Sequence, residues 1–165
     1  MVVMGVSGSG KSSVGRLLAE RAQVPYADGD SFHSVESKAK MAAGHPLTDD
    51  DRWPWLARVG AWLAAHEATG AVVSCSALKR VYRDALRRSA PRAVFLHLTG
   101  EPEQLAQRMR ARADHFMPAT LLHSQLATLE PLQADERGVV LEVGEASALE
   151  LAERGLTLLF CEARS

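Results

Sequence analysis

The sequence contains no asparagine, only two cysteines and few aromatic residues. Without asparagine, the chain cannot carry the Asn-Lys-x-Asp motif with which GTPases normally recognise guanine. Cys75 and Cys161 lack the paired spacing of a metal site, and such sparse cysteine suits a reducing compartment. No apolar run approaches the roughly 18 to 20 residues of a membrane-spanning helix, and the N-terminal residues lack the pattern of a signal peptide. We therefore expect a cytoplasmic protein.

A strong charge of either sign is also lacking, because the formal net charge is −1 and the sequence pI is about 6.6. This balance is not typical of nucleic-acid-binding proteins, and we expect neither nucleic acid nor a membrane as a partner. The 165 residues, 47% of them hydrophobic, are typical of one globular domain. One segment, residues 79–92, is locally basic, and it favours either a solvated helix face or an anion-binding role for one or two of its residues.

Short apolar segments alternate with helical patterns along the chain. The strand-like segments are residues 2–6, 24–28, 71–75, 93–98 and 138–143, and the helical patterns cover residues 11–22, 53–68, 102–112, 118–130 and 146–160. This alternation predicts an α/β domain with a mainly parallel sheet. The continuous apolar runs favour strands that are covered on both faces. Ligands bind such sheets beyond the carboxyl ends of the strands.

The stretch GVSGSGKS, residues 5–12, matches the nucleotide-binding pattern G-x-x-x-x-G-K-[ST]. It follows a strand pattern and opens a helical one, which is the context that the motif requires. Three glycines permit turns that a Cβ atom would block: Gly5, Gly8 and Gly10. Successive backbone N–H groups can then bind phosphate, while Lys11 reaches the β- and γ-phosphates and Ser12 binds Mg²⁺. We therefore expect a nucleoside triphosphate and Mg²⁺ as cofactors.

Polar residues after the second strand pattern suggest an acceptor site. A motor or AAA-type ATPase would need a longer chain and an acidic pair at a strand end, whereas the run 71–75 ends in serine and cysteine. A small-molecule kinase therefore fits better. Asp30, in YADGDSFH, is placed to orient an acceptor hydroxyl and take its proton, or to hold a water molecule on Mg²⁺. A turn rich in aspartate and glycine is the structural alternative.

Arginines provide further candidates. Asp49–Asp51 are typical of a loop and a helix N-cap, and Arg52, which follows them, suits an acceptor that carries a carboxylate or several hydroxyls. Arg108 and Arg112 are four residues apart and project from one helix face. A pair of this kind suits closing over phosphates.

Five segments resemble the gluconokinase family of sugar-acid kinases: GVSGSGKSSVG, DGDSFH, KMAAGHPLTDDDRWPWL, SCSALKRVYRDALR and HFMPATLLHSQLATLE. The resemblance extends from the first strand to about Glu136. It implies a P-loop NTPase-like, three-layer α/β/α fold similar to shikimate and adenylate kinases, with a five-stranded parallel sheet and a small helical lid at about residues 108–123. It also implies a single kinase domain over residues 1–165, a homodimer, and transfer of the ATP γ-phosphate to the 6-hydroxyl of D-gluconate.

The same resemblance assigns individual residues. It implies catalytic roles for Lys11, Asp30 and Arg112. It places Gly5, Gly8, Ser9, Gly10, Lys11, Ser12, Ser13 and Arg108 at the nucleotide, with Ser12 as the metal ligand. It places Asp30, His33, Lys40, Arg52, Lys79, Arg83 and His115 at the acceptor.

The chain departs from the family pattern at several positions. Ser34 and Ser37 stand where proline and asparagine are usual, Asp114 stands where glycine is common, and Leu126 replaces a frequent phenylalanine. These changes leave the phosphate-binding loop intact. Two other functions stay open: a kinase of another small hydroxy acid such as shikimate, and a module that senses ATP without transferring phosphate.

Overall fold

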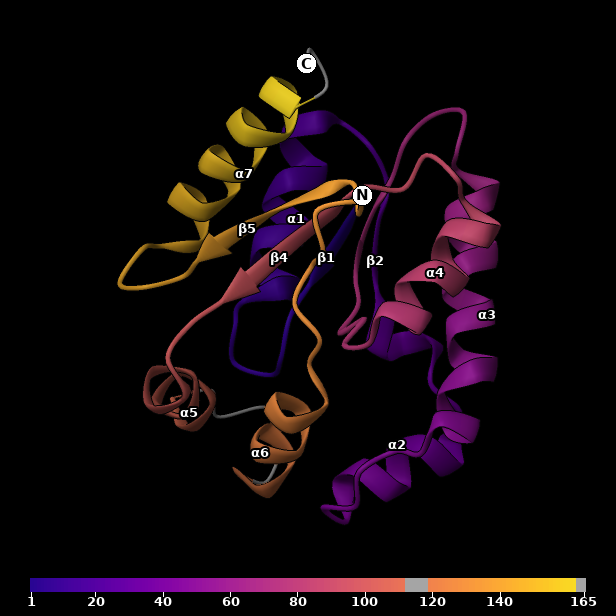
Figure 1. The fold of residues 1–165 in the computed structure, drawn as a ribbon, viewed down its shortest axis with the longest axis vertical. Coiled ribbons are helices and arrows are strands. Elements are labelled where there is room, and N and C mark those ends of the chain that lie inside the picture. Colours follow the sequence, from indigo (N-terminus) through magenta and orange to yellow (C-terminus); the bar gives the residue numbers. More distant parts are fainter. Residues whose placement is uncertain (112–118, 163–165) are drawn as a thin grey trace.

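Five parallel strands form the central sheet of this computed structural model, in the order β2-β3-β1-β4-β5 (Figure 1). The strands are β1 (Val2–Met4), β2 (Tyr26–Asp28), β3 (Val72–Ser74), β4 (Phe95–Thr99) and β5 (Gly138–Glu142). The structure describes residues 1–111 and 119–162. The predicted α/β class and five-stranded parallel sheet are confirmed.

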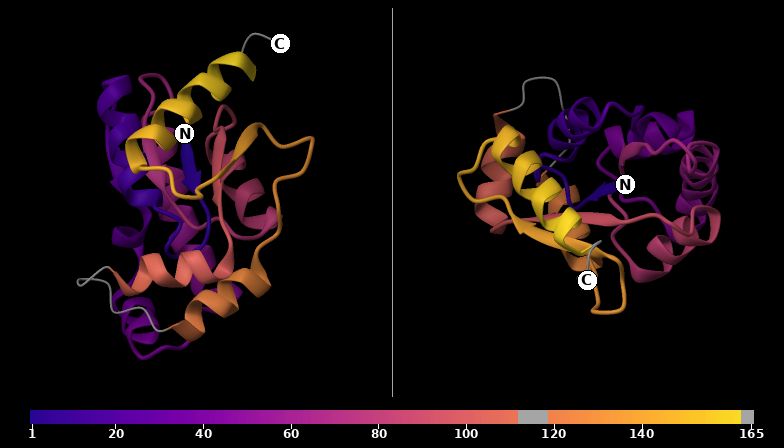
Figure 2. Two further views of the ribbon diagram at one scale, coloured as in Figure 1. Left: turned by 90° about the vertical axis from the view of Figure 1, so that its left-hand side faces the viewer. Right: turned by 90° about the horizontal axis from the view of Figure 1, so that it is seen from above.

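Helices cover both faces of the sheet (Figures 1 and 2). The described helical elements are α1 (Lys11–Ala22), the 3₁₀ helix η1 (Gly29–Phe32), α2 (Val35–Ala42), α3 (Asp49–Ala65), α4 (Arg80–Ser89), α5 (Pro102–Arg110), α6 (Ala119–Thr128) and α7 (Ala148–Glu162). Helices α1 and α7 pack on one face, and α3 and α4 pack on the other. Helices α2, α5 and α6 lie at the end toward which the strands point. No described helix has the length and apolarity needed to cross a membrane.

Alternating side chains of β1 divide the core into two layers, because successive residues of a strand point to opposite faces. Val3 belongs to the layer beneath α1 and α7, whereas Val2 and Met4 belong to the layer beneath α3 and α4. The inner strands are therefore covered on both faces, as their apolar runs predict. The edge strand β5 differs, because Val140 is 51% exposed.

Two helical segments differ from the sequence-based expectation. Helix α3 begins at Asp49, so Asp49–Asp51 form its first turn rather than a loop. Thr48 caps this turn: its Oγ1 accepts a hydrogen bond from the Asp51 N–H, and the Asp51 carboxylate accepts one from the Thr48 N–H. Carboxylates are also stabilised at a helix N-terminus by its dipole. Helix α2 was absent from the expected elements, and Ser34 caps it by accepting a hydrogen bond from the Ser37 N–H.

Candidate active site

The phosphate-binding loop joins β1 to α1 at the carboxyl edge of the sheet. Gly10 is the N-cap of α1 and has φ +89°, in the left-handed region that favours glycine. Gly8 has φ +82°, and a Cβ atom there would lie 2.5 Å from the carbonyl oxygen of Leu105. Gly10 has no side chain with which to cap α1, so the helix begins without a side-chain cap. The loop therefore presents the N-terminus of a helix, which is a suitable site for phosphate.

Two side chains of the loop donate hydrogen bonds to one backbone carbonyl. Ser9, which is fully buried, donates from Oγ to the Val6 oxygen at 2.8 Å. Lys11 donates from Nζ to the same oxygen at 2.9 Å. The Lys11 ammonium therefore lies over the loop that would hold the phosphates.

A cluster of oxygen atoms lies beside Ser12 at the start of α1. The Tyr26 hydroxyl lies 2.9 Å from Ser74 Oγ and 3.5 Å from Asp28 Oδ2, and it lies close to Ser12. Burial raises the pKa of Tyr26, so this hydroxyl keeps its proton at neutral pH. Hydroxyl and carboxylate oxygens are ligands that Mg²⁺ prefers. No cluster of three or more His, Cys, Asp or Glu residues suited to a metal occurs in the described part of the chain, so this site would need phosphate or water oxygens as further ligands.

A cleft opens from the phosphate-binding loop toward η1, α3 and α6. Its polar lining includes Ser7, Lys11, Asp30, His33, Arg52 and Gln125. Leu47, Trp55 and Leu121 supply apolar surface. The structure thus brings together four of the sequence-predicted residues: Lys11, Asp30, His33 and Arg52. Basic and acidic side chains share this cleft with apolar ones, as is typical of a small-molecule site.

Asp30 and His33 lie on one side of the cleft. The His33 ring stacks on Trp55 with centroids 4.3 Å apart, and the Trp55 indole N–H donates to the Gly29 oxygen at 2.7 Å. Burial lowers the pKa of His33 to about 4, although the Asp30 charge opposes this shift. His33 Nε2 lies 3.9 Å from Asp30 Oδ1, and the Asp30 side chain is 61% exposed. A neutral His33 does not form an ion pair with Asp30, whose side chain stays accessible to a ligand.

Arg52 provides the positive charge of the cleft wall. Its Nη1 donates to the Tyr82 hydroxyl at 3.1 Å and lies 3.8 Å from Asp49 Oδ1. Lys79 lies 2.9 Å from the same Asp49 oxygen, to which Tyr82 donates a short hydrogen bond. The Arg52 side chain is only 12% exposed. Its guanidinium is therefore held in place at the edge of the cleft.

Lys40 and Lys79 pair with carboxylates of α3 and are not part of the cleft lining. Lys40 Nζ lies 2.7 Å from Asp51 Oδ2, and Lys79 Nζ lies 2.9 Å from Asp49 Oδ1. Both lysines thus bind carboxylates in the first turn of α3, the turn that carries Arg52. This arrangement favours a supporting role for the two lysines over direct contact with an acceptor.

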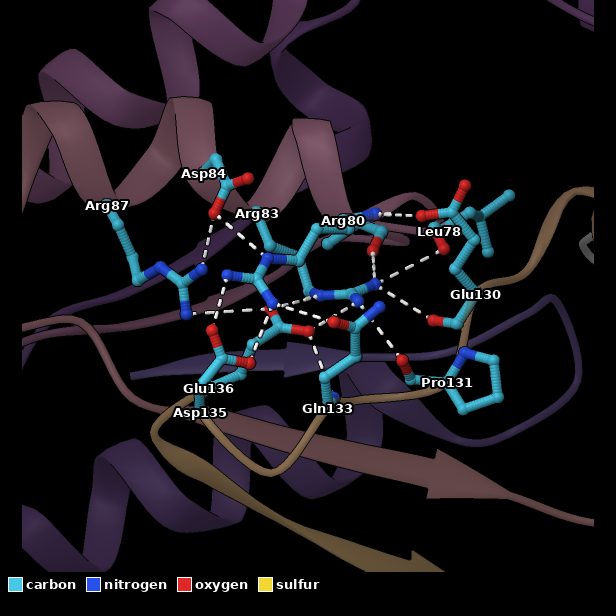
Figure 3. Close-up of polar contacts among 11 residues, drawn as sticks. Leu78, Arg80, Arg83, Asp84, Arg87, Glu130, Pro131, Gln133, Asp135 and Glu136 are labelled. Carbon is cyan, nitrogen blue, oxygen red and sulfur yellow. Dashed lines mark hydrogen bonds and ion pairs between the residues drawn. The ribbon is translucent and has the colours of Figure 1, made fainter.

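Arg83 lies outside the cleft, in a buried network between α4 and the segment 130–136 (Figure 3). Its side chain is 0% exposed and forms two hydrogen bonds of 2.7 Å with the Glu136 carboxylate. The remaining donors reach the backbone oxygens of Ala77, Leu78, Glu130 and Pro131. The expectation that Arg83 faces a bound anion is therefore corrected, because the chain itself already binds its guanidinium on all sides.

The residues predicted near the lid are described only in part. Arg108 Nη2 donates to the Gly144 oxygen at 2.7 Å and approaches the Ala146 oxygen at 3.3 Å. It thus contacts the segment that follows β5, and its contact with a nucleotide stays a prediction. Arg112 and His115 lie outside the described residues.

Sequence reasoning passed over three residues that build the cleft. Trp55 lies in the predicted helical pattern 53–68 and was not singled out as a site residue, yet its ring stacks on His33. Ser7 and Gln125 were not singled out, although both line the cleft. Gln125 is a polar residue among leucines in the helical pattern 118–130. This position could have indicated a side chain that faces a polar site instead of the core.

A phosphate-binding loop that opens onto a cleft lined by a carboxylate and by basic side chains, on a sheet of this order, defines a P-loop kinase of small molecules. A family model described as shikimate kinase matches residues 7–154. A gluconokinase from Gluconobacter oxydans is 46% identical over 147 residues, which cover 88% of this chain and 82% of that protein. The chain belongs to the gluconokinase family.

Comparison with solved structures gives a higher TM-score and identity for a gluconokinase than for a shikimate kinase. The crystal structure of a gluconokinase from Sinorhizobium meliloti superposes with a TM-score of 0.90 at 50% identity, covering 99% of this chain and 92% of that chain. A shikimate kinase from Acinetobacter baumannii, solved in complex with shikimate, gives a TM-score of 0.61 at 19% identity, with coverage of 98% and 92%. The second likeness shows the fold alone.

Proposed function

We propose that this chain transfers the γ-phosphate of ATP to the 6-hydroxyl of D-gluconate, forming 6-phospho-D-gluconate and ADP, with Mg²⁺ as the metal ion. The family membership supports gluconate as the acceptor. One observation carries the proposal: Lys11 of the phosphate-binding loop and Asp30 line the same cleft. A terminal phosphate on the loop would therefore face a carboxylate across a space lined with polar groups.

Asp30 and Lys11 would divide the chemistry between them. The Asp30 carboxylate accepts a hydrogen bond from the acceptor hydroxyl and takes its proton as the oxygen bonds to the γ-phosphorus. The bond from that phosphorus to the bridging oxygen breaks, and this oxygen leaves on ADP. Lys11 stabilises the negative charge on the phosphoryl group during transfer.

The surroundings of Ser12 fit a magnesium ion. Ser12 lies close to the Tyr26 hydroxyl, which contacts the oxygens of Asp28 and Ser74. Ser12 would bind the ion directly, and Asp28 would hold one of its water molecules. When bound, the ion would offset the charge of the phosphate oxygens.

Arg52 would bind the carboxylate of the sugar acid. A guanidinium forms paired hydrogen bonds with a carboxylate, and Tyr82 holds that of Arg52 at the cleft edge. This role accounts for a partly buried cation on the acceptor side of the cleft.

A coupled ADP-release assay over a panel of acids tests the proposal. We expect kcat/KM for D-gluconate to exceed that for shikimate and for other sugar acids by at least about 100-fold. If only another acid were turned over strongly, that acid and not gluconate would be the acceptor. ATP binding without turnover on any acid would instead favour the sensing module.

A further inference from the structure

Gln125 joins α6 to the phosphate-binding loop. Its Oε1 accepts a hydrogen bond from the Ser7 N–H at 2.7 Å, between residues 118 positions apart in the sequence. A backbone N–H can only donate, so the amide atom that faces Ser7 must be the oxygen. This contact fixes the orientation of the Gln125 amide.

The fixed orientation leaves the amide nitrogen for another partner. Within residues 1–111 and 119–162, the only hydrogen bond of the Gln125 side chain is the one with Ser7. The side chain is half-buried and lines the cleft that Lys11 and Asp30 share. The NH₂ group therefore offers two uncharged donors to a ligand in this cleft.

Contacts at the C-terminal end of α6 hold Gln125 in position. The Glu130 N–H donates to the Leu78 oxygen at 2.8 Å, and the Glu130 carboxylate accepts from the Arg80 N–H at 2.6 Å. The buried guanidinium of Arg83 binds the Glu130 oxygen at 3.0 Å (Figure 3). These contacts fix the end of α6 to the start of α4. The backbone that carries Gln125 is therefore held beside the phosphate-binding loop.

We propose that Gln125 is an acceptor-binding residue that also positions the phosphate-binding loop. Its oxygen holds Ser7, and its NH₂ group donates a hydrogen bond to a hydroxyl oxygen of a polyol acceptor. This inference rests on the proposed function, since it assigns a group that recognises the acceptor of that reaction. An uncharged donor suits a hydroxyl, whereas Arg52 suits the carboxylate of the same molecule.

Two variants separate the two roles of this amide. Gln125→Glu keeps an oxygen for the Ser7 N–H but removes the donors, whereas Gln125→Met removes both. We expect both variants to raise KM for D-gluconate by about 10-fold or more. KM for ATP should change less than about threefold in Gln125→Glu and should rise more in Gln125→Met, which no longer accepts the hydrogen bond from the Ser7 N–H. Ala127→Ser, at an exposed position of the same helix, serves as the matched control and should leave both constants unchanged. Melting temperatures confirm that the variants are folded.

The outcomes are distinct. A rise in acceptor KM in both variants supports the proposal. A defect in Gln125→Met with a normal Gln125→Glu would show that Gln125 acts only on the loop, and normal kinetics in both would remove it from the site. If the wild-type chain prefers another acid, that result by itself contradicts the proposed function. KM of the Gln125 variants is then measured for the preferred acid.

Discussion

Arg83 and Arg52 carry the same charged group in neighbouring parts of the molecule, but their surroundings differ. Arg83 has no exposed surface, and it is bound by the Glu136 carboxylate and by four backbone oxygens. Arg52 lines the cleft, with one hydrogen bond to Tyr82 and a longer approach to Asp49. The first guanidinium has used its donors within the chain, whereas the second retains donors for a ligand.

The number of donors already bound within the chain distinguishes a structural arginine from a ligand-binding one better than its charge does. A buried ion pair with complete hydrogen bonding holds elements together, and removing one partner leaves an uncompensated charge. A charge that faces a cleft can act on a substrate at little cost to the fold. We therefore expect substitutions in the buried network to lower stability, and substitutions in the cleft to lower activity.

The largest effect is expected from Lys11→Ala in the cleft. Loss of the ammonium removes stabilisation of the transferring phosphoryl group, so kcat should fall by about 10³-fold or more. The melting temperature should stay close to that of the wild type. ADP release at saturating substrates and a thermal melt measure the two quantities. A stable variant with wild-type kcat would exclude Lys11 from the chemistry.

Arg83→Met tests the buried side of the comparison. The variant leaves the buried Glu136 with only the longer ion pair with Arg87 at 3.5 Å, which should cost about 3–5 kcal/mol in the free energy of unfolding. Urea unfolding measures this loss, and kcat should persist in the folded fraction at low temperature. The double variant Arg83→Met/Glu136→Leu is the matched control and should recover most of the stability. If Arg83→Met were stable but inactive, Arg83 would have a direct role in the active site.

A pH effect is expected from His97, which lies in β4 near the same network. Neither of its ring nitrogens has a hydrogen-bond partner among the described residues. Burial, assisted by the charge of Arg83, lowers the pKa of His97 from 6.5 to about 4. Below pH 6.5 the unfolded chain binds a proton that the folded chain rejects, so stability should fall as the pH drops from 6.5 to 4, by about 3 kcal/mol in total.

Unfolding of the wild type and of His97→Leu across this pH range measures the contribution of His97. The variant has no imidazole to protonate, so its stability should depend less on pH by about the same 3 kcal/mol. Equal slopes in the two proteins would show that His97 does not contribute.

The smallest of these effects is expected from Arg52→Ala. Loss of a charge-assisted hydrogen bond costs roughly 1.5–3 kcal/mol, so KM for the sugar acid should rise about 10- to 100-fold. KM for ATP should stay nearly unchanged. The exposed Arg88→Ala provides the control. A change confined to KM for ATP would show that Arg52 binds the nucleotide and not the sugar acid. The proposed acceptor-binding role of Arg52 would then be wrong.

Much of the fold could be predicted from local patterns. The apolar runs define the strands, because buried parallel strands need continuous apolar segments, and the glycine-rich loop predicts where α1 begins. The start of α3 and the presence of α2 were not predicted. Both depend on capping by Thr48 and Ser34, whose side chains are equally common in loops.

The site could be predicted less completely, because residue type does not show which partner a side chain will meet. Arg83 belongs to a basic segment typical of anion binding, but it is neutralised by Glu136, 53 positions away in the sequence. Lys40 and Lys79 likewise meet carboxylates of α3. Long-range pairing of this kind is set by the tertiary fold and leaves no local signal.

The most direct test of the account is kcat of Asp30→Asn at saturating ATP and D-gluconate, with ATP-analogue affinity measured alongside. Asparagine keeps the shape of the side chain but cannot take the hydroxyl proton. We expect kcat to fall by about 10²- to 10⁴-fold while the affinity changes less than about threefold. A variant with near wild-type kcat would contradict the assignment of the cleft as the place of phosphoryl transfer.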